Sequence, residues 1–113
     1  MNHKILLVCV LAFLAGQTST IGVNGNAAAG KQKAVTVCAA CHGADGNKTL
    51  DNSYPKLAGQ YPDYLLKALK EYKSGKRVNA IMAGQVQALT DADMANLALY
   101  YGSLKSQIGT LPK

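Results

Sequence analysis

The chain has 113 residues, of which 49% are hydrophobic, and this length allows one domain at most. Its 12 Lys and Arg residues outnumber 6 Asp and Glu residues, which gives a formal net charge of +6. A basic chain can meet acidic proteins, anionic membrane surfaces or nucleic acids. Nucleic acid is not an expected partner, because no basic run is interleaved with aromatic residues.

The first part of the chain has the order of a secretory signal peptide. Lys4 precedes an apolar run from Ile5 to Leu14, and small and polar residues follow. The apolar run has ten residues, too few for a membrane-spanning helix, although an uncleaved anchor is the alternative. We predict a signal peptide over residues 1–28 and an exported, periplasmic domain over residues 29–113. The candidate cleavage positions are Gly22, Gly25 and the run Ala27-Ala28-Ala29.

The rest of the chain predicts an all-α domain with three main helices, since no segment alternates with period two. The first predicted helix runs from about Gly30 to Cys41. The second begins at Pro62, where a missing N–H costs nothing, and stops at Gly75. The third follows Thr90, a predicted N-cap. Its apolar face comprises Met94, Leu97, Ala98, Tyr101 and Leu104. The predicted loops are Gly43–Pro55 and Lys76–Leu89.

All Cys and His residues outside the leader fall in one five-residue motif. Cys38, Cys41 and His42 form C-x-x-C-H, the motif of covalent haem attachment. The two-residue gap brings both thiols to one edge of a haem, where they add to its two vinyl groups. The next residue, His42, then lies under the iron as an axial ligand.

Three other uses of this motif are weaker predictions. A structural zinc site needs four ligands, and no second Cys pair or second His remains outside the leader. A thioredoxin-like motif expects a strand-rich context, and a Cys38–Cys41 disulfide is the plain alternative for an exported protein. We therefore predict one covalently attached haem c, with Cys38 and Cys41 as its attachment residues.

The second axial ligand of the iron is predicted to be a methionine. A thioether is a soft donor, and Met/His ligation raises the reduction potential of haem. Met82 lies in the predicted Ala/Gly-rich loop, 40 residues after His42, where the loop can fold over the opposite face of the ring. Met94 lies on the apolar face of a predicted helix, where a core role is the simpler interpretation. Met82 is the predicted ligand, and its alternative is a loop methionine packed on the core.

Four segments together resemble the small bacterial class I cytochromes c that carry a single haem. These cytochromes are similar to one half of the two-haem periplasmic cytochromes c. The resemblance covers essentially the whole chain after the leader, and its segments are CAACHGADGN at 38–47, YPKLAGQ at 54–60, YKSGKR at 72–77 and NAIM at 79–82.

The resemblance implies a cytochrome c fold, with helices and loops wrapped around one haem. It implies that the Pro55 carbonyl accepts a hydrogen bond from His42, which would fix the orientation of the proximal ring. It also places Gly30 at a close crossing with the last helix, near Leu97 and Tyr100. Ala34 departs from the family, in which larger residues are common at that position.

The expected function is electron transfer without catalysis. With both axial positions filled, the iron offers no substrate site, so electrons would pass by an outer-sphere route. Expected partners are redox proteins such as an oxidase, reductase or dehydrogenase, met transiently near membrane complexes. An acidic docking surface on the partner would face the basic side chains of Lys48, Lys56, Lys76 and Arg77. The alternatives are a permanent haem subunit, or a sensor or enzyme with a labile sixth ligand.

Overall fold

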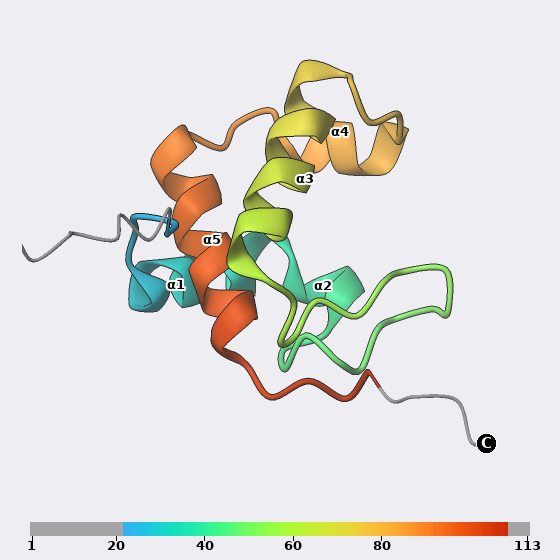
Figure 1. The fold of residues 1–113 in the computed structure, drawn as a ribbon. Coiled ribbons are helices and arrows are strands. Elements are labelled where there is room, and N and C mark those ends of the chain that lie inside the picture. Colours follow the sequence, from blue (N-terminus) through green and yellow to red (C-terminus); the bar gives the residue numbers. More distant parts are fainter. Residues whose placement is uncertain (1–21, 109–113) are drawn as a thin grey trace, which may run out of the picture.

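The computed structural model describes residues 22–108, and every regular element in this range is a helix (Figure 1). The helices in chain order are α1 (Ala27–Val37), α2 (Ala39–His42), α3 (Pro62–Ser74), α4 (Ala80–Val86) and α5 (Asp91–Ser103). The predicted all-α class is therefore confirmed. Most of the predicted leader falls on residues 1–21, outside the described range. Within residues 22–108, no helix has the length and apolar character needed to cross a bilayer.

The second and third predicted helices form with the predicted caps. Pro62 begins α3, and Gly75 ends it in the left-handed conformation, at a φ of 82°. Thr90 caps α5 through a reciprocal pair of hydrogen bonds with Asp93, each 3.0 Å long. The carboxylate of Asp93 accepts the Thr90 N–H, and this bond lowers the pKa of Asp93 below its ordinary value.

The packing of α1 across α5 is the most extensive contact between any two helices of the described chain (Figure 1). Gly30 lies at this crossing, where an added Cβ would stand 2.0 Å from the Asn96 carbonyl oxygen and 2.9 Å from the Tyr100 Cβ. The close crossing expected at Gly30 is thus present. Leu97, the other residue expected there, is 1% exposed and belongs to the core.

The core lies between α1, α3 and α5, and α5 supplies most of its side chains. Ala34 is buried in it, so this small residue lies within the closely packed α1–α5 interface. Met94 is 1% exposed and is among the largest fully buried side chains. The buried cluster comprises Ala34, Leu65, Val86, Leu89, Met94, Leu97, Ala98, Tyr100 and Tyr101.

The first predicted helix differs from the observed one at both ends. It begins earlier, at Ala27, where the Asn26 side chain accepts a hydrogen bond from the Ala29 N–H over 3.0 Å. It also stops at Val37, and Cys38 separates it from the short helix α2. The predicted boundary between residues 28 and 29 consequently falls inside α1. The Asn26 N–H donates to the Asn96 side chain over 2.7 Å, so the residue before α1 is already docked on α5.

The segment Lys76–Leu89, predicted as a loop, contains the helix α4. Asn79 caps α4 by accepting a hydrogen bond from the Met82 N–H over 3.0 Å. Its seven residues include Gly84, which weakens the helical pattern in the sequence. Val86 is the only buried residue of α4, so the helix depends on contacts with α3 more than on its own propensity.

Gly30→Ala tests the α1–α5 crossing. The added methyl group would overlap backbone atoms of α5, and overpacking of this kind costs about 1–3 kcal/mol of unfolding free energy. Gly84→Ala is the matched control, because no atom lies within 4 Å of its added Cβ and alanine favours a helix. Chemical denaturation should show a lower midpoint for Gly30→Ala only; equal midpoints for Gly30→Ala and the parent chain would contradict the crossing.

Candidate functional site

The two cysteines of the motif lie on one turn of backbone. The N–H groups of Cys41 and His42 donate to the Cys38 carbonyl oxygen over 3.2 and 3.0 Å. Both cysteines are free and half-buried, and no disulfide joins them. Burial raises the pKa of the Cys38 thiol above its ordinary value. Both sulfurs are unbonded, so both are free to form thioethers.

His42 is 5% exposed and held by one hydrogen bond. Its Nδ1 lies 2.9 Å from the Pro55 carbonyl oxygen. Because a carbonyl oxygen can only accept, Nδ1 must carry the hydrogen, and Nε2 keeps its lone pair for a metal. The ring of Tyr54 meets the imidazole edge-on, with a centroid distance of 6.4 Å. The sequence positions of His42 and Pro55, 13 residues apart, are thus brought together in space.

A folded-back loop follows the motif. Gly43 has a φ of 85°, and a Cβ there would stand 2.3 Å from the Lys48 carbonyl oxygen. The Leu50 N–H returns to the Cys41 carbonyl oxygen over 2.9 Å, which closes the loop onto α2. Asp45 accepts the N–H groups of Lys48 and Asn47 over 2.9 and 2.8 Å. These two hydrogen bonds, Lys48 first, lower the pKa of Asp45.

Asn47 is a site residue whose role the sequence did not reveal. It is 6% exposed, and its Nδ2 donates to the Lys105 carbonyl oxygen over 3.0 Å. Its Oδ1 accepts the Gln107 N–H, also over 3.0 Å. In the sequence, Asn47 indicates only a turn. In the structure it fastens the segment after α5 to the loop after the cysteines.

Tyr101 places a buried polar atom beside the motif. Its hydroxyl group is buried and has no hydrogen-bond partner among the described residues. The Cys38 side chain packs against the buried cluster that contains Tyr101, and burial, then the Cys38 thiol, raises the pKa of Tyr101 above its ordinary value. Two free thiols, an imidazole with an available Nε2 and an unsatisfied hydroxyl group together fit a covalently attached haem. They do not fit zinc, since no group of three or more His, Cys, Asp and Glu side chains gathers in the described chain.

Met82 is half-buried in the first turn of α4, in a helix and not in the predicted loop. Its side chain packs against the buried cluster from outside, as does Cys38. Met94, the alternative ligand, belongs to the cluster itself. Of the two methionines, Met82 is therefore the one at the margin of the core.

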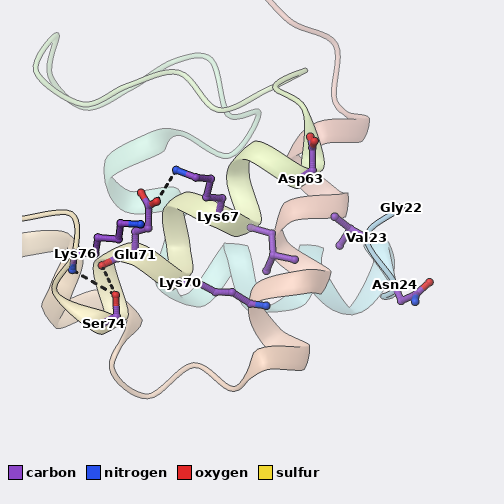
Figure 2. A pocket seen from close by; sticks show the side chains of 10 residues that line it. Gly22, Val23, Asn24, Asp63, Lys67, Lys70, Glu71, Ser74 and Lys76 are labelled. Carbon is purple, nitrogen blue, oxygen red and sulfur yellow. Dashed lines mark hydrogen bonds and ion pairs between the residues drawn. The ribbon is translucent and has the colours of Figure 1, made fainter. Parts of the chain in front are cut away.

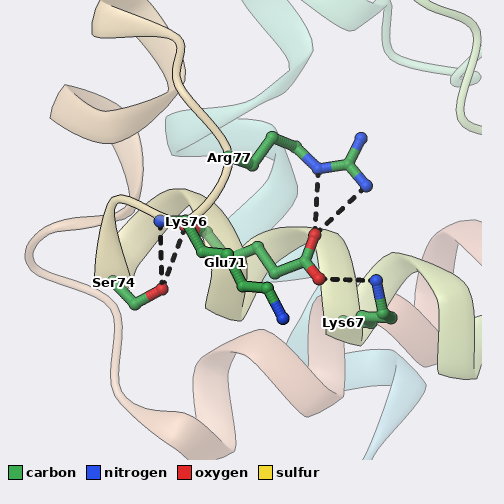
Figure 3. Close-up of polar contacts among 5 residues, drawn as sticks. All are labelled: Lys67, Glu71, Ser74, Lys76 and Arg77. Carbon is green, nitrogen blue, oxygen red and sulfur yellow. Dashed lines mark hydrogen bonds and ion pairs between the residues drawn. The ribbon is translucent and has the colours of Figure 1, made fainter.

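Polar contacts fasten the chain around α4 to α3. Glu71 accepts hydrogen bonds from Lys67 over 2.5 Å and from the Arg77 Nε over 3.3 Å (Figure 3). The Arg77 guanidinium also lies over two rings, 5.8 Å from the centroid of Tyr64 and 5.5 Å from that of Tyr72. The neighbouring cations, Lys67 first, lower the pKa of Glu71. We call these five residues, Tyr64, Lys67, Glu71, Tyr72 and Arg77, the α3 clamp.

The α3 clamp changes the predicted docking surface. Arg77 was expected to face a partner, but its guanidinium is engaged within the chain by Glu71 and the two tyrosine rings. Lys48, Lys56 and Lys76 are exposed, as expected. Beyond α4, the Lys73 ammonium group donates to the Leu89 carbonyl oxygen, so α3 holds the chain on both sides of α4.

A surface hollow of about 620 Å³ lies along α3 and includes no residue of the C-x-x-C-H motif (Figure 2). Lys67, Glu71 and Lys70 line its middle, and Ser74 and Lys76 lie at one end. It is open to solvent and bordered by charged side chains. We therefore place the functional site at the motif and not in this hollow.

Comparisons with known proteins identify the family of the chain. The model of the cytochrome c family matches residues 27–105. Cytochrome c4 of Pseudomonas aeruginosa is 48% identical over 104 residues, covering 92% of this chain and 50% of that protein. Cytochrome c-554(548) of Halomonas halodenitrificans is 45% identical over 82 residues, covering 70% of this chain and 96% of that protein.

The fold agrees as well. The crystal structure of reduced recombinant cytochrome c4 from Pseudomonas stutzeri superposes with a TM-score of 0.69 at 39% identity, covering 76% of this chain and 49% of that one. The chain therefore spans about half the length of the cytochrome c4 proteins it matches. The motif, the helical fold and these matches together show that the chain belongs to the cytochrome c family, with Cys38 and Cys41 placed to attach one haem c.

Proposed function

We propose that this protein is a periplasmic electron carrier that passes single electrons between larger redox proteins. The observation that carries the proposal is the His42–Pro55 hydrogen bond, which leaves Nε2 free beside two free thiols. When bound, the haem supplies a one-electron redox centre with a positive-side potential under Met/His ligation. The role of the chain is to hold that centre, shield it and present it to partners.

The proposed axial ligands are His42 and Met82. The support for His42 is its buried, hydrogen-bonded ring. The support for Met82 is its place at the margin of the core, with its backbone N–H fixed by Asn79. With both axial positions filled, no site remains for a substrate, so transfer is outer-sphere and the protein has no catalytic role. Rigidly held ligands also keep reorganisation small.

Met82→Ala tests the axial assignment. It should retain covalent haem through acid–acetone extraction but lose the weak far-red sulfur–iron band of the oxidised protein. Met94→Leu is the control, because leucine fills a core site of similar volume and should leave the band intact. If the far-red band survives in Met82→Ala and disappears in Met94→Leu, the axial ligand is Met94 and not Met82.

The α3 clamp is proposed to keep Met82 in place. Glu71→Gln removes the charge that pairs with Arg77, and the chain before α4 should loosen. The far-red band should then disappear at a lower temperature than in the parent protein. Lys67→Gln is the matched control, since it leaves the Glu71–Arg77 pair intact. Equal loss temperatures for Glu71→Gln and Lys67→Gln would show that the Glu71–Arg77 pair of the α3 clamp does not position the ligand.

Redox proteins are the proposed partners. Relatives of the chain include a thiosulfate dehydrogenase electron acceptor and a cytochrome subunit of sulfide dehydrogenase. We propose a transient encounter with the acidic surface of an oxidase, reductase or dehydrogenase near the membrane. Lys48, Lys56 and Lys76 would supply the complementary charge.

Ionic strength tests this docking. The second-order rate of reduction by an acidic redox protein, measured by stopped flow, should fall steeply as salt is added, because salt screens exposed charges. Reduction by an uncharged quinol is the control and should change little. A rate of reduction by the acidic protein that does not change with ionic strength would contradict the charged docking surface.

A second candidate is a permanent haem subunit of a dehydrogenase. The observation that favours it is exposed apolar surface close to Met82, where Val78 is 93% and Ile81 54% exposed. Co-purification with a second chain in constant ratio would support the subunit, and a monomeric protein recovered alone would support the free carrier.

A further inference from the structure

Among the Asn and Gln residues of the described range 22–108, Asn47 alone is buried. Its Nδ2 donates to the carbonyl oxygens of Lys105 over 3.0 Å and Asp45 over 3.3 Å, and its Oδ1 accepts the Gln107 N–H over 3.0 Å. Burying an amide group costs free energy unless it is hydrogen-bonded, and a fully paired buried group specifies one arrangement of the segments that it joins. Asn47 therefore fixes residues 105–107 relative to the loop that follows the C-x-x-C-H motif.

Residues 105–107, which we call the strap, lie against both arms of this loop. Asn47 holds the strap on the first arm through its two bonds to Lys105 and Gln107. On the second arm, Gly59 leaves room for it: a Cβ added at Gly59 would stand 2.5 Å from the Ser106 Cβ and 3.0 Å from the Ser106 nitrogen. The strap is therefore in close contact with two parts of the loop that are 12 residues apart in the sequence.

The two arms of the loop are also bonded to each other. The Gly46 carbonyl oxygen accepts the N–H groups of Leu57 and Ala58 over 2.9 and 3.1 Å. Each side of this pairing is next in the sequence to a residue that contacts the strap. Asn47 follows Gly46 on the first arm, and Gly59 follows Ala58 on the second arm. The strap therefore holds both arms close to the place where they pair.

Pro55 lies two residues before this pairing, and its carbonyl oxygen is 2.9 Å from the His42 Nδ1. We propose that Asn47 is a positioning residue, which holds the strap on the loop and thereby keeps the Pro55 carbonyl group on His42. The Nδ1 hydrogen bond makes Nε2 more basic. A more basic ligand favours oxidised iron and lowers the reduction potential, so Asn47 would act on the potential through Pro55. The inference rests on the proposed ligation by His42 and is independent of which methionine ligates the iron.

Gln107→Pro in the haem-loaded, full-length chain is the test, because it deletes the N–H group that Asn47 accepts and leaves Asn47 in place. Gln107→Ala is the matched control, since it shortens the same exposed side chain and keeps the N–H group. In the reduced Gln107→Pro protein, NMR should show the His42 Nδ1 hydrogen exchanging with solvent about fivefold faster, as expected for one lost hydrogen bond of ordinary net strength. The midpoint potential should rise. Both quantities should keep their parent values in Gln107→Ala.

Asn47→Ala removes all three hydrogen bonds and should change both quantities further in the same direction. Gln107→Pro decides the question if Asn47→Ala fails to fold. A lower melting temperature in Gln107→Pro, with exchange and potential unchanged, would show that the strap has a structural role only and would overturn the proposal. Unchanged values of all three would overturn it equally. Covalent haem and the far-red band test the electron-carrier proposal separately, so their retention in Gln107→Pro would leave that proposal intact if the positioning role fails.

Discussion

The close approach of α1 and α5 at Gly30 is the constraint on which the site depends. With no Cβ at Gly30, the backbone of α1 can rest against the Asn96 carbonyl group. That contact fixes the start of α2, because α1 leads directly into Cys38. It also fixes Tyr101, five residues further along α5 than Asn96. A helix crossing with no chemistry of its own thereby sets where the haem motif meets the core.

The loop that follows the C-x-x-C-H motif is organised by hydrogen bonds more than by apolar packing. The ring of His42 is oriented by a carbonyl group from a separate segment, at Pro55. Asn47 joins that loop to the chain after α5. Each of these bonds joins two residues that are at least 13 positions apart in the sequence. An electron carrier needs this rigidity, because a ligand set that moves little between oxidation states keeps the barrier to transfer low.

Local signals predicted the helices well where they were strong. Pro62, Gly75 and Thr90 mark the ends of α3 and α5, and the apolar stripes are continuous between them. The C-x-x-C-H motif located the attachment site because its chemistry is contained in five residues. These local signals could not predict contacts between residues that are distant in the sequence. The helix α4 has seven residues and is held by α3, and Arg77 pairs with Glu71 across a turn that no sequence pattern revealed. The unpaired Tyr101 hydroxyl group likewise could not be predicted, since the sequence indicates only an apolar helix face.

Binding of carbon monoxide to the reduced, haem-loaded protein at neutral pH would test the central claim most directly. A closed His42/Met82 site has no vacant position, so we expect the visible spectrum to stay unchanged under carbon monoxide. Rapid formation of a carbon monoxide adduct would show an open or labile sixth position. That result would contradict the electron-carrier assignment and favour a sensor or enzyme.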